Sequence, residues 1–509
     1  MPDPAEYVTD VPYARTFHKQ LAPSTLRLVA ALGGFQPPPA DDFDYCELGS
    51  ASGDTLVTLA AANPTARFVG VELSPEQVAV ARDLAAGGSV DNARFVTADF
   101  ENLAGEDLPL FDFIGAHGVL SWVSAKKWQA VVAFAKARLK PGGIFYASYD
   151  ALPGWASIEP VRRLMLDHTA HMAQTPGSTL ERARLGLEYA KRLADGGAGF
   201  FANHPTAKQM LAVAGQAGLQ YVVHEYFHAH FRPMYFADVA RELREAGLTY
   251  AGRLPFHLNI RELAVPPGLQ EVARGIQDRL AFETFVDYAQ SEMLRSDVYV
   301  KTEAAPSDEM RRDFFARTPF GTVTSTSLVS RSVRLPLYTL DFSGPLYDAL
   351  IPAIAEGAAE AGELVTRPKL QPFGVERVSF GLQNLAVGVQ AVPMRSASKR
   401  AAAQRYAIPL AHNRAALARS LESDAPLVLA APQTGSGVTV SLVDAMCLHL
   451  LANVEPSKRK PWVRTFAAGR KLPLAGTGED LVAAVLREVD SFTSKLAPKL
   501  AELGILEPA

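Results

Sequence analysis

The stretch ELGSASGDTL, from Glu47 to Leu56, decides the fold, because a strand pattern ends in it and a helix pattern begins. The strand is predicted over FDYCELG, residues 43–49, and the helix starts near Gly53. Between them lies a turn of small residues, which lets a ligand approach the backbone closely. A glycine turn after a strand is also ordinary turn chemistry, so this stretch needs support from the residues that follow it.

Four further apolar runs follow the first strand at the spacing of repeated βα units, which predicts a parallel sheet. The helix after the second run is marked at its start by Ser74, which can cap it, by Pro75, and by Gln77, which completes a capping box. The four runs are RFVGVEL (67–73), RFVTADF (94–100), FDFIGAHG (111–118) and GIFYASYD (143–150).

Acidic residues stand at the ends of the second and third predicted strands. Glu72 has the position from which a Rossmann-type site accepts both ribose hydroxyls. Asp99 could accept an adenine amino group, and Phe100 could pack on the ring. Since the carboxyl ends of parallel strands share one edge of the sheet, three strand ends converge on one nucleoside. A dinucleotide is disfavoured because Ala51 occupies the second glycine position of the fingerprint, where pyrophosphate needs close approach.

In this order, these residues resemble the class I S-adenosylmethionine (SAM)-dependent methyltransferases over roughly residues 40–155. The resemblance implies that SAM is the cofactor, with its methionine end beside the first turn, its ribose on Glu72 and its adenine on Asp99. It also implies that residues 117–119 run beside the cofactor. The implied cofactor-binding residues are Glu47, Gly49, Ala51, Gly53, Glu72, Leu73, Asp99, Phe100, His117, Gly118 and Val119.

A narrower resemblance rests on VPYARTFHKQLAP (11–23), AHGVLSWVS (116–124) and SYDALPGW (148–155). Together these are similar to bacterial methyltransferases that carry a methyltransferase regulatory domain, a group similar to the rickettsial protein-lysine methyltransferases. Residues 224–254 are similar to the start of that regulatory region. Two positions depart from the family: Ala51 replaces the usual glycine, and Asp150 stands where asparagine is usual.

This resemblance implies a protein partner, with a lysine side chain as the methyl acceptor. An amine nitrogen must be neutral when it attacks, and a nearby carboxylate could receive its proton directly or through water. Asp150, at the end of the fifth strand, is the candidate for this role. Tyr149 and Tyr13 are named with it as catalytic candidates, and Trp122 as a further pocket wall.

The length of 509 residues predicts about three domains. We expect a SAM-binding domain over 1–260 with a helical insertion at about 156–220, a middle accessory domain over 261–385 and a mostly helical domain over 386–509. Two strands predicted within the first domain, YVVHEYF (221–227) and LTYAGRL (248–254), would complete a seven-stranded Rossmann-like sheet. The fold class is therefore α/β, followed by α+β accessory domains.

Composition excludes several partners and compartments. A net charge of −4 and a pI near 6.3 give no overall basic surface for nucleic acid. No stretch offers the ~18 uninterrupted apolar residues that membrane insertion needs. The only cysteines, Cys46 and Cys447, lie in apolar runs and lack metal-ligand spacing, as expected of reduced core residues. We expect a cytoplasmic protein. The sequence does not decide whether it forms a homodimer.

Two other functions compete with methyl transfer. HEYFH, residues 224–228, matches the H-E-x-x-H pattern of zinc hydrolases, in which Glu225 would act as the base. Its β-branched and aromatic surroundings favour a strand, which lacks the helical spacing that a zinc site requires, so we expect no metal. Alternatively, the departures at Ala51 and Asp150 would fit a SAM-binding regulatory protein without turnover.

Overall fold

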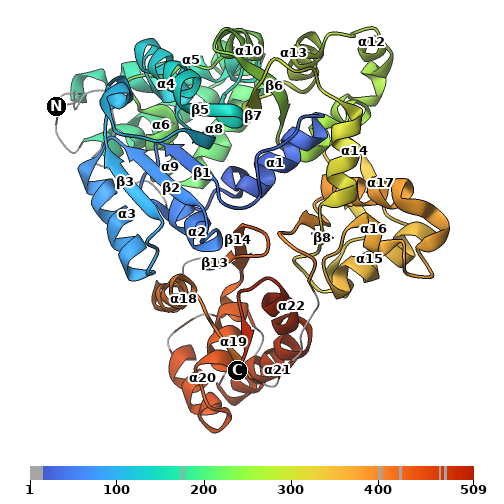
Figure 1. The fold of residues 1–509 in the computed structure, drawn as a ribbon. Coiled ribbons are helices and arrows are strands. Elements are labelled where there is room, and N and C mark those ends of the chain that lie inside the picture. The colour runs from blue at the N-terminus through green and yellow to red at the C-terminus, as the bar shows by residue number, and fades with distance from the viewer. Residues whose placement is uncertain are drawn as a thin grey trace.

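The centre of the molecule is a seven-stranded mixed sheet with the order β3-β2-β1-β4-β5-β7-β6 (Figure 1). The computed structural model describes residues 15–173, 175, 178–398, 403, 405–423, 427–468, 470, 472–474 and 478–509. The first five strands run parallel, whereas β7 is antiparallel to both β5 and β6. The strands are β1 (Asp44–Leu48), β2 (Arg67–Glu72), β3 (Ala93–Thr97), β4 (Phe111–Ala116), β5 (Leu139–Asp150), β6 (Leu248–Arg253) and β7 (Leu294–Lys301).

The predicted seven-stranded Rossmann-like sheet is confirmed, but one of its strands was assigned to the wrong segment. Residues 221–227 do not form a strand, because Leu219–Tyr226 form helix α9, whose Val222 and Val223 are buried in the helical insertion. The seventh strand is instead β7, residues 294–301. The sheet therefore extends beyond residue 260, where we expected the first domain to end.

Helices cover both faces of the sheet, and the alternation of side chains along each strand assigns residues to one face or the other. On one face the core is formed with α1 (Pro23–Leu32), α2 (Asp54–Ala62) and α3 (Pro75–Gly87). On the other it is formed with α4 (Ala125–Arg138) and α10 (Phe236–Glu245).

The predicted helical insertion follows β5 and has its own small core around Met165, Leu187 and Val223. After α10 and β6, a second group of helices leads the chain back to β7. The insertion contains α5 (Glu159–His168), α6 (Thr179–Asp195), α7 (Gly199–Asn203), α8 (Pro205–Ala217) and α9; the second group contains α11 (Arg261–Ala264), α12 (Gln270–Arg274) and α13 (Arg279–Gln290).

The middle region forms a separate lobe beside α1, with a core of helices and short strands (Figure 1). Its helices are α14 (Asp308–Arg317), α15 (Pro345–Glu356), α16 (Ala361–Leu364) and α17 (Gly374–Val387); its strands are β8 (Phe320–Gly321), β9 (Ser332–Arg334), β10 (Thr339–Asp341) and β11 (Val392–Pro393).

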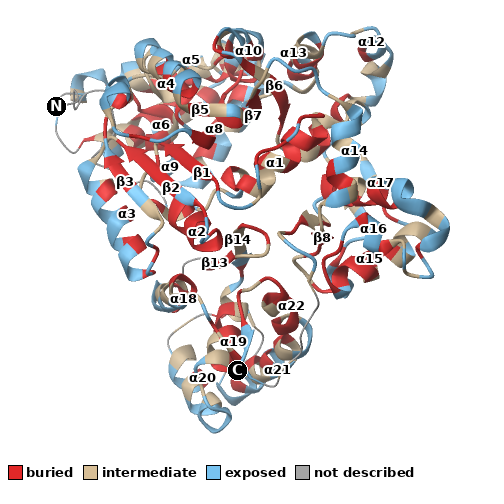
Figure 2. Cartoon of the chain, viewed as in Figure 1, coloured by how far each residue is buried: buried red, intermediate tan, exposed pale blue. Residues whose placement is uncertain are grey.

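The C-terminal region is a mostly helical lobe that carries one β-hairpin. Figure 2 shows buried residues in each of the three lobes and where the hairpin meets α2. The elements are β12 (Tyr406–Ala407), α18 (Ala411–Ser423), β13 (Leu427–Ala431), β14 (Ser436–Val440), α19 (Leu442–Ala452), α20 (Arg459–Ala467), α21 (Gly478–Lys495), α22 (Ala497–Glu502) and β15 (Glu507–Pro508).

Polar bonds fasten this C-terminal lobe to the end of α2. The buried Asn63 side chain donates to the carbonyl oxygens of Leu59 at 2.6 Å and Gly435 at 3.0 Å. Its own oxygen accepts from the Arg395 guanidinium at 2.5 Å. Because α2 begins at the turn after β1, the C-terminal lobe supports the helix that leads out of that turn.

Two expectations from the sequence concern the cysteines and the membrane. Cys46 and Cys447 are both buried with free thiols. Among the described residues, none of the helices has the length and apolar content needed to cross a membrane.

Candidate functional site

The turn after β1 requires glycine at two positions. Gly49 and Gly53 have φ of +75° and +74°, which glycine adopts at little cost. A Cβ at Gly49 would lie 2.8 Å from Val119 Cγ2, and one at Gly53 would lie 2.8 Å from Ala81 Cβ. Ala51 also has a positive φ of +45°, so an alanine holds a strained backbone at a position where the resemblance leads us to expect glycine.

The Glu72 carboxylate joins the end of β2 to this turn. Its Oε2 accepts the Ala51 N–H at 3.0 Å, and its Oε1 accepts the N–H groups of Leu73 at 2.8 Å and Ser74 at 3.0 Å. The predicted Ser74 cap is present, since its hydroxyl accepts the Gln77 N–H at 3.2 Å. Burial raises the pKa of Glu72, and its three backbone bonds partly oppose that rise.

Two polar side chains near the turn are buried and lack hydrogen-bond partners among the described residues. They are Glu47, through its Oε2, and Ser50, through its hydroxyl, and each residue is 5% exposed. Burial, and secondarily the charge of Glu72, raises the pKa of Glu47 to about 8. Such orphaned groups are costly in a folded core and are explained by a polar ligand that meets them.

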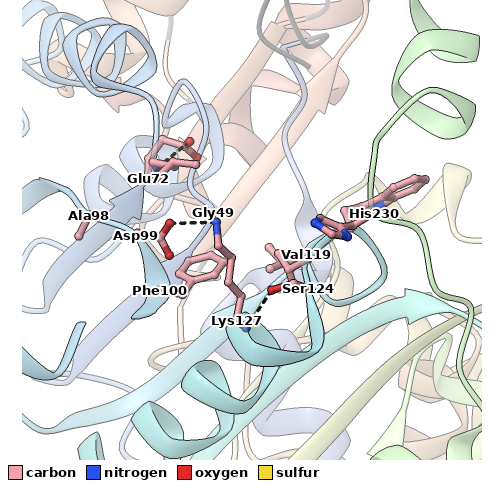
Figure 3. Close-up of a pocket in the computed structure, with 13 residues that line it drawn as sticks. Gly49, Glu72, Ala98, Asp99, Phe100, Val119, Ser124, Lys127 and His230 are labelled. Atoms are coloured by element: carbon pink, nitrogen blue, oxygen red, sulfur yellow. Dashed lines mark hydrogen bonds and ion pairs between the residues drawn. The ribbon is translucent and has the colours of Figure 1, made fainter. Parts of the chain in front are cut away.

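A pocket that is partly open to solvent lies at the carboxyl ends of β1, β2 and β3 (Figure 3). The predicted cofactor residues that line it are Gly49, Glu72, Leu73, Asp99, Phe100, Gly118 and Val119. Trp122, predicted as a wall, lines it as well. Sequence reasoning missed Ala98, Val123, Ser124, Lys127 and His230, which complete the lining.

Asp99 is held in this pocket by two donors. Its Oδ1 accepts the Glu101 N–H at 3.1 Å, and its Oδ2 lies 2.9 Å from the Lys127 ammonium. In Figure 3, Lys127 extends from α4 along the pocket toward Asp99. A carboxylate and an ammonium therefore stand together where the sequence predicted a carboxylate alone.

His117, predicted beside the cofactor, does not line the pocket. Its Nδ1 lies 2.8 Å from Ser148 Oγ and 3.1 Å from the Tyr146 hydroxyl, and its Nε2 lies 3.2 Å from Gln20 Nε2. Burial and then the nearby His18 lower its pKa to about 3, so the ring is neutral. Its side chain instead ties the segment before α1 to β5.

Of the two catalytic candidates that the structure describes, Asp150 and Tyr149, Asp150 is the last residue of β5, at the edge of the sheet that carries the pocket. Tyr149 is 1% exposed and donates to Asp297 Oδ2 at 2.7 Å, because alternation along β5 turns it into the core beneath α4 and α10. Tyr13 lies outside the described residues. The Asp150 side chain is hydrogen-bonded to Ser121 and Trp155, and burial raises its pKa to about 6.

Aromatic rings extend from the pocket toward Asp150. The Trp122 ring centroid lies 4.8 Å from that of Phe231, which lies 4.7 Å from that of Trp155. Glu225 on α9 adds a second carboxylate, whose pKa is raised to about 7 by burial and then by the charge of Asp150. The sequence pattern pointed to neither Trp155 nor Glu225 as a neighbour of Asp150.

The HEYFH segment is helical over 224–226, contrary to the strand we expected. The ring centroids of His224 and His228 are 6.0 Å apart. However, in the part of the chain that the structure describes, no group of three or more His, Cys, Asp or Glu side chains could hold a metal ion. Glu225 instead faces the charge of Asp150.

The residues of the pocket fit SAM. Gly49 brings the backbone of the turn to the pocket wall, and the unpartnered Glu47 and Ser50 oxygens beside this turn can accept from the ammonium group of the methionine part. Glu72 and Asp99 offer carboxylates to a ribose and an adenine. When bound, SAM would supply a methyl group on a positively charged sulfur.

Comparison with known proteins identifies two regions of the chain. Residues 46–145, from β1 to β5, match the model of a methyltransferase domain. Residues 218–301, from α9 to β7, match that of a predicted methyltransferase regulatory domain. The second match supplies β6 and β7, so the region described as regulatory completes the sheet of the methyltransferase domain.

Relatives share the architecture of almost the whole chain. An uncharacterised protein of Synechocystis is 27% identical over 505 residues, which cover 98% of this chain and 99% of the relative. An uncharacterised protein of Rickettsia prowazekii is 27% identical over 293 residues, covering 56% of this chain and 51% of the relative. The structure of PKMT2 from Rickettsia typhi in complex with AdoHcy matches with a TM-score of 0.73 and 17% identity, covering 97% of this chain and all of PKMT2.

These matches agree with the order of the sheet and with the glycine turn and acidic strand ends of the pocket. The chain therefore contains a class I SAM-dependent methyltransferase domain, together with a region that matches a predicted methyltransferase regulatory domain.

Proposed function

We propose that the chain transfers a methyl group from SAM to an amine nitrogen of a protein, with a lysine side chain as the acceptor. The observation that carries this proposal is the buried carboxylate of Asp150, reached from the pocket through a chain of aromatic rings. Trp122 belongs both to the pocket lining and to this chain of rings.

The surroundings of Asp150 suit a long aliphatic amine. Aromatic rings such as Trp122, Phe231 and Trp155 pack against methylene groups and attract a cation over their faces. Asp150 and Glu225 provide carboxylates for the cationic end of the side chain. A lysine has this combination of an apolar stem and an ammonium head.

Asp150 can also prepare the nitrogen for reaction. An ammonium must lose a proton before it attacks, and a carboxylate whose pKa is raised to about 6 is a better proton acceptor than an ordinary one while still ionised at neutral pH. Apart from accepting this proton, the chain contributes to the reaction by aligning the nitrogen with the methyl group and by excluding water.

The structural relative supports the arrangement of the chain but does not decide the acceptor. PKMT2 of Rickettsia typhi has the same arrangement over the whole of its length. At 17% identity this likeness concerns the fold, so the choice of lysine rests on the carboxylates and rings around Asp150.

The proposal is tested by identifying the amino acid that receives the label. The full chain is incubated with SAM carrying a labelled methyl group and a heat-treated extract of soluble proteins, and the protein fraction is hydrolysed and analysed by mass spectrometry. We expect labelled methyl-lysine, absent from a sample without the chain. Label in another amino acid or only in small molecules would contradict the proposal, and binding of S-adenosylhomocysteine without any transfer would favour a regulatory protein.

A further inference from the structure

Lys127 is a cation of low exposure in the pocket, and the sequence pattern gives no role for it. Its side chain is 12% exposed, and its ammonium lies 2.9 Å from Oδ2 of Asp99, whose side chain is 20% exposed. Both residues line the pocket, and Lys127 reaches Asp99 from the first turn of α4 (Figure 3).

The neighbouring lysine shows how an ordinary surface pair looks on the same helix. Lys126 is 78% exposed and pairs with Glu101, outside the pocket. Exposed pairs of this kind contribute little to stability, whereas burying a lysine costs desolvation and side-chain freedom. The low exposure of the Lys127 side chain therefore needs an explanation that does not apply to the exposed Lys126.

The Asp99 and Lys127 pair presents two hydrogen-bonding groups side by side. Asp99 is fixed by the Glu101 N–H at 3.1 Å and by Lys127, and its carboxylate has acceptor capacity left. An ammonium has three donors, and the bond to Asp99 uses one of them. An acceptor next to a donor matches the edge of adenine, where the amino group donates and the adjacent ring nitrogen N1 accepts.

We propose that Lys127 is a cofactor-binding residue whose ammonium donates to N1 of the SAM adenine while Asp99 accepts from the adjacent amino group. Phe100 and Val119, which line the same pocket, provide apolar surface for the planar ring. This inference rests on the SAM site and does not depend on which acceptor is methylated.

A purely structural role for Lys127 is the competing explanation. The ion pair joins α4 to the residues that follow β3, and it could serve only to hold these elements together. In that case loss of the ammonium would weaken every ligand of the pocket by the same factor. A direct bond to N1 instead makes the loss depend on that one nitrogen atom.

The test varies the chain and the ligand together. Full-length wild type and the variants Lys127→Met and Lys126→Met are titrated calorimetrically with S-adenosylhomocysteine and with its 1-deaza analogue, in which N1 is a C–H group. We expect wild type to bind the analogue about tenfold more weakly, as the loss of one hydrogen bond to a charged group predicts. Lys127→Met should bind S-adenosylhomocysteine about tenfold more weakly and no longer distinguish the two ligands. Lys126→Met should behave as wild type.

Three results would overturn the proposal. Equal binding of the two ligands by wild type would exclude any bond to N1, and this arm decides the question even if Lys127→Met fails to fold. Equal weakening of both ligands by Lys127→Met would assign the lysine a structural role. Absence of S-adenosylhomocysteine binding by wild type would remove the site itself, whereas failure to methylate lysine would leave this inference untouched.

Discussion

Glu72 Oε2, at the end of β2, accepts the backbone N–H of Ala51 at 3.0 Å, so one strand end supports the turn that follows its neighbour. The carboxylate that is expected to bind a ribose therefore also maintains the shape of the methionine end of the site. Cofactor affinity and local stability should depend on the same side chain.

Glu72→Ala is expected to lose both properties. The substitution leaves the N–H groups of Ala51, Leu73 and Ser74 without their acceptor. We expect a loss of about 2 kcal/mol in the free energy of unfolding, seen by thermal denaturation as a melting transition lower by roughly 4 to 8 °C. Glu76→Ala, which removes an exposed carboxylate from the first turn of α3, four residues along the chain, is the matched control and should leave the transition in place.

Calorimetric titration of the same variants tests the ribose contact. Glu72→Ala should bind S-adenosylhomocysteine at least about tenfold more weakly than Glu76→Ala, as expected for the loss of a charged hydrogen-bond acceptor. Unchanged affinity in Glu72→Ala would refute its assignment to the cofactor site.

Ala51→Gly is expected to stabilise the chain. Ala51 has φ of +45°, a region that costs a residue with a Cβ roughly 1 to 2 kcal/mol and costs glycine little. Part of that gain is offset by the freedom that glycine has in the unfolded chain, so we expect a net gain of about 0.5 to 1 kcal/mol. Ala61→Gly, within α2, should be destabilising instead. A lower melting temperature for Ala51→Gly than for wild type would contradict the strain inferred at this turn.

Cofactor affinity should depend on pH through Glu47. With a pKa raised to about 8, this carboxyl is mostly protonated at pH 7. The ammonium group of the ligand favours the ionised form, so binding releases a proton and affinity rises from pH 6 to pH 8, by at most about tenfold per unit. Calorimetry in buffers of different ionisation enthalpy measures the proton release. The Glu47→Gln variant should release no proton when it binds the ligand. If wild type also releases no proton, the ligand does not change the ionisation of Glu47.

Asn63 should couple the C-terminal lobe to α2. Asn63→Ala removes bonds to Leu59, Gly435 and Arg395 in a buried position, and we expect a loss of about 2 to 3 kcal/mol. Differential scanning calorimetry should show the transition that contains the C-terminal lobe at a lower temperature. Asn203→Ala, at an exposed helix end, serves as the control, and equal behaviour of the two variants would argue against a fastening role for Asn63.

The first half of the sheet could be predicted because its information is local. Short apolar runs that end in Gly49, Glu72 and Asp99 mark parallel strands and the edge at which they meet. The pocket residues that these strand ends carry follow directly from the pattern.

The second half could not be predicted in the same way, because tertiary contacts override the pattern. Strand β7 contains Arg295 and Asp297, both 0% exposed, whose charges make the segment look like a surface loop. These two charges pair with each other, and Arg295 also pairs with Glu283 on α13, a partner that the strand's own sequence does not reveal. Conversely, the β-branched residues of α9 favour a strand locally, but they are buried as a helix within the insertion.

The site residues likewise divide into those that the local sequence predicts and those that only the fold reveals. Asp99 was found because it ends a strand, whereas Lys127 lies in a helix whose sequence gives no sign that one lysine of a pair is buried. Glu225 stood out as part of a metal motif, and only the fold reveals Asp150 as its neighbour. Tyr149 is named as a candidate beside Asp150, but successive residues of a strand point to opposite faces, and its side chain lies in the core.

The most direct test of the central claim compares Asp150→Ala with wild type in the transfer step itself. The initial rate of label incorporation from SAM into the soluble protein extract is measured at pH 7.5 for both chains, after calorimetry has shown that their affinities for S-adenosylhomocysteine agree within about twofold. The account predicts a rate at least about 100-fold lower for Asp150→Ala, as expected for the loss of a general base. An equal rate at equal cofactor affinity would contradict the assignment of Asp150 to the acceptor and, with it, the proposed path from the pocket to the amine.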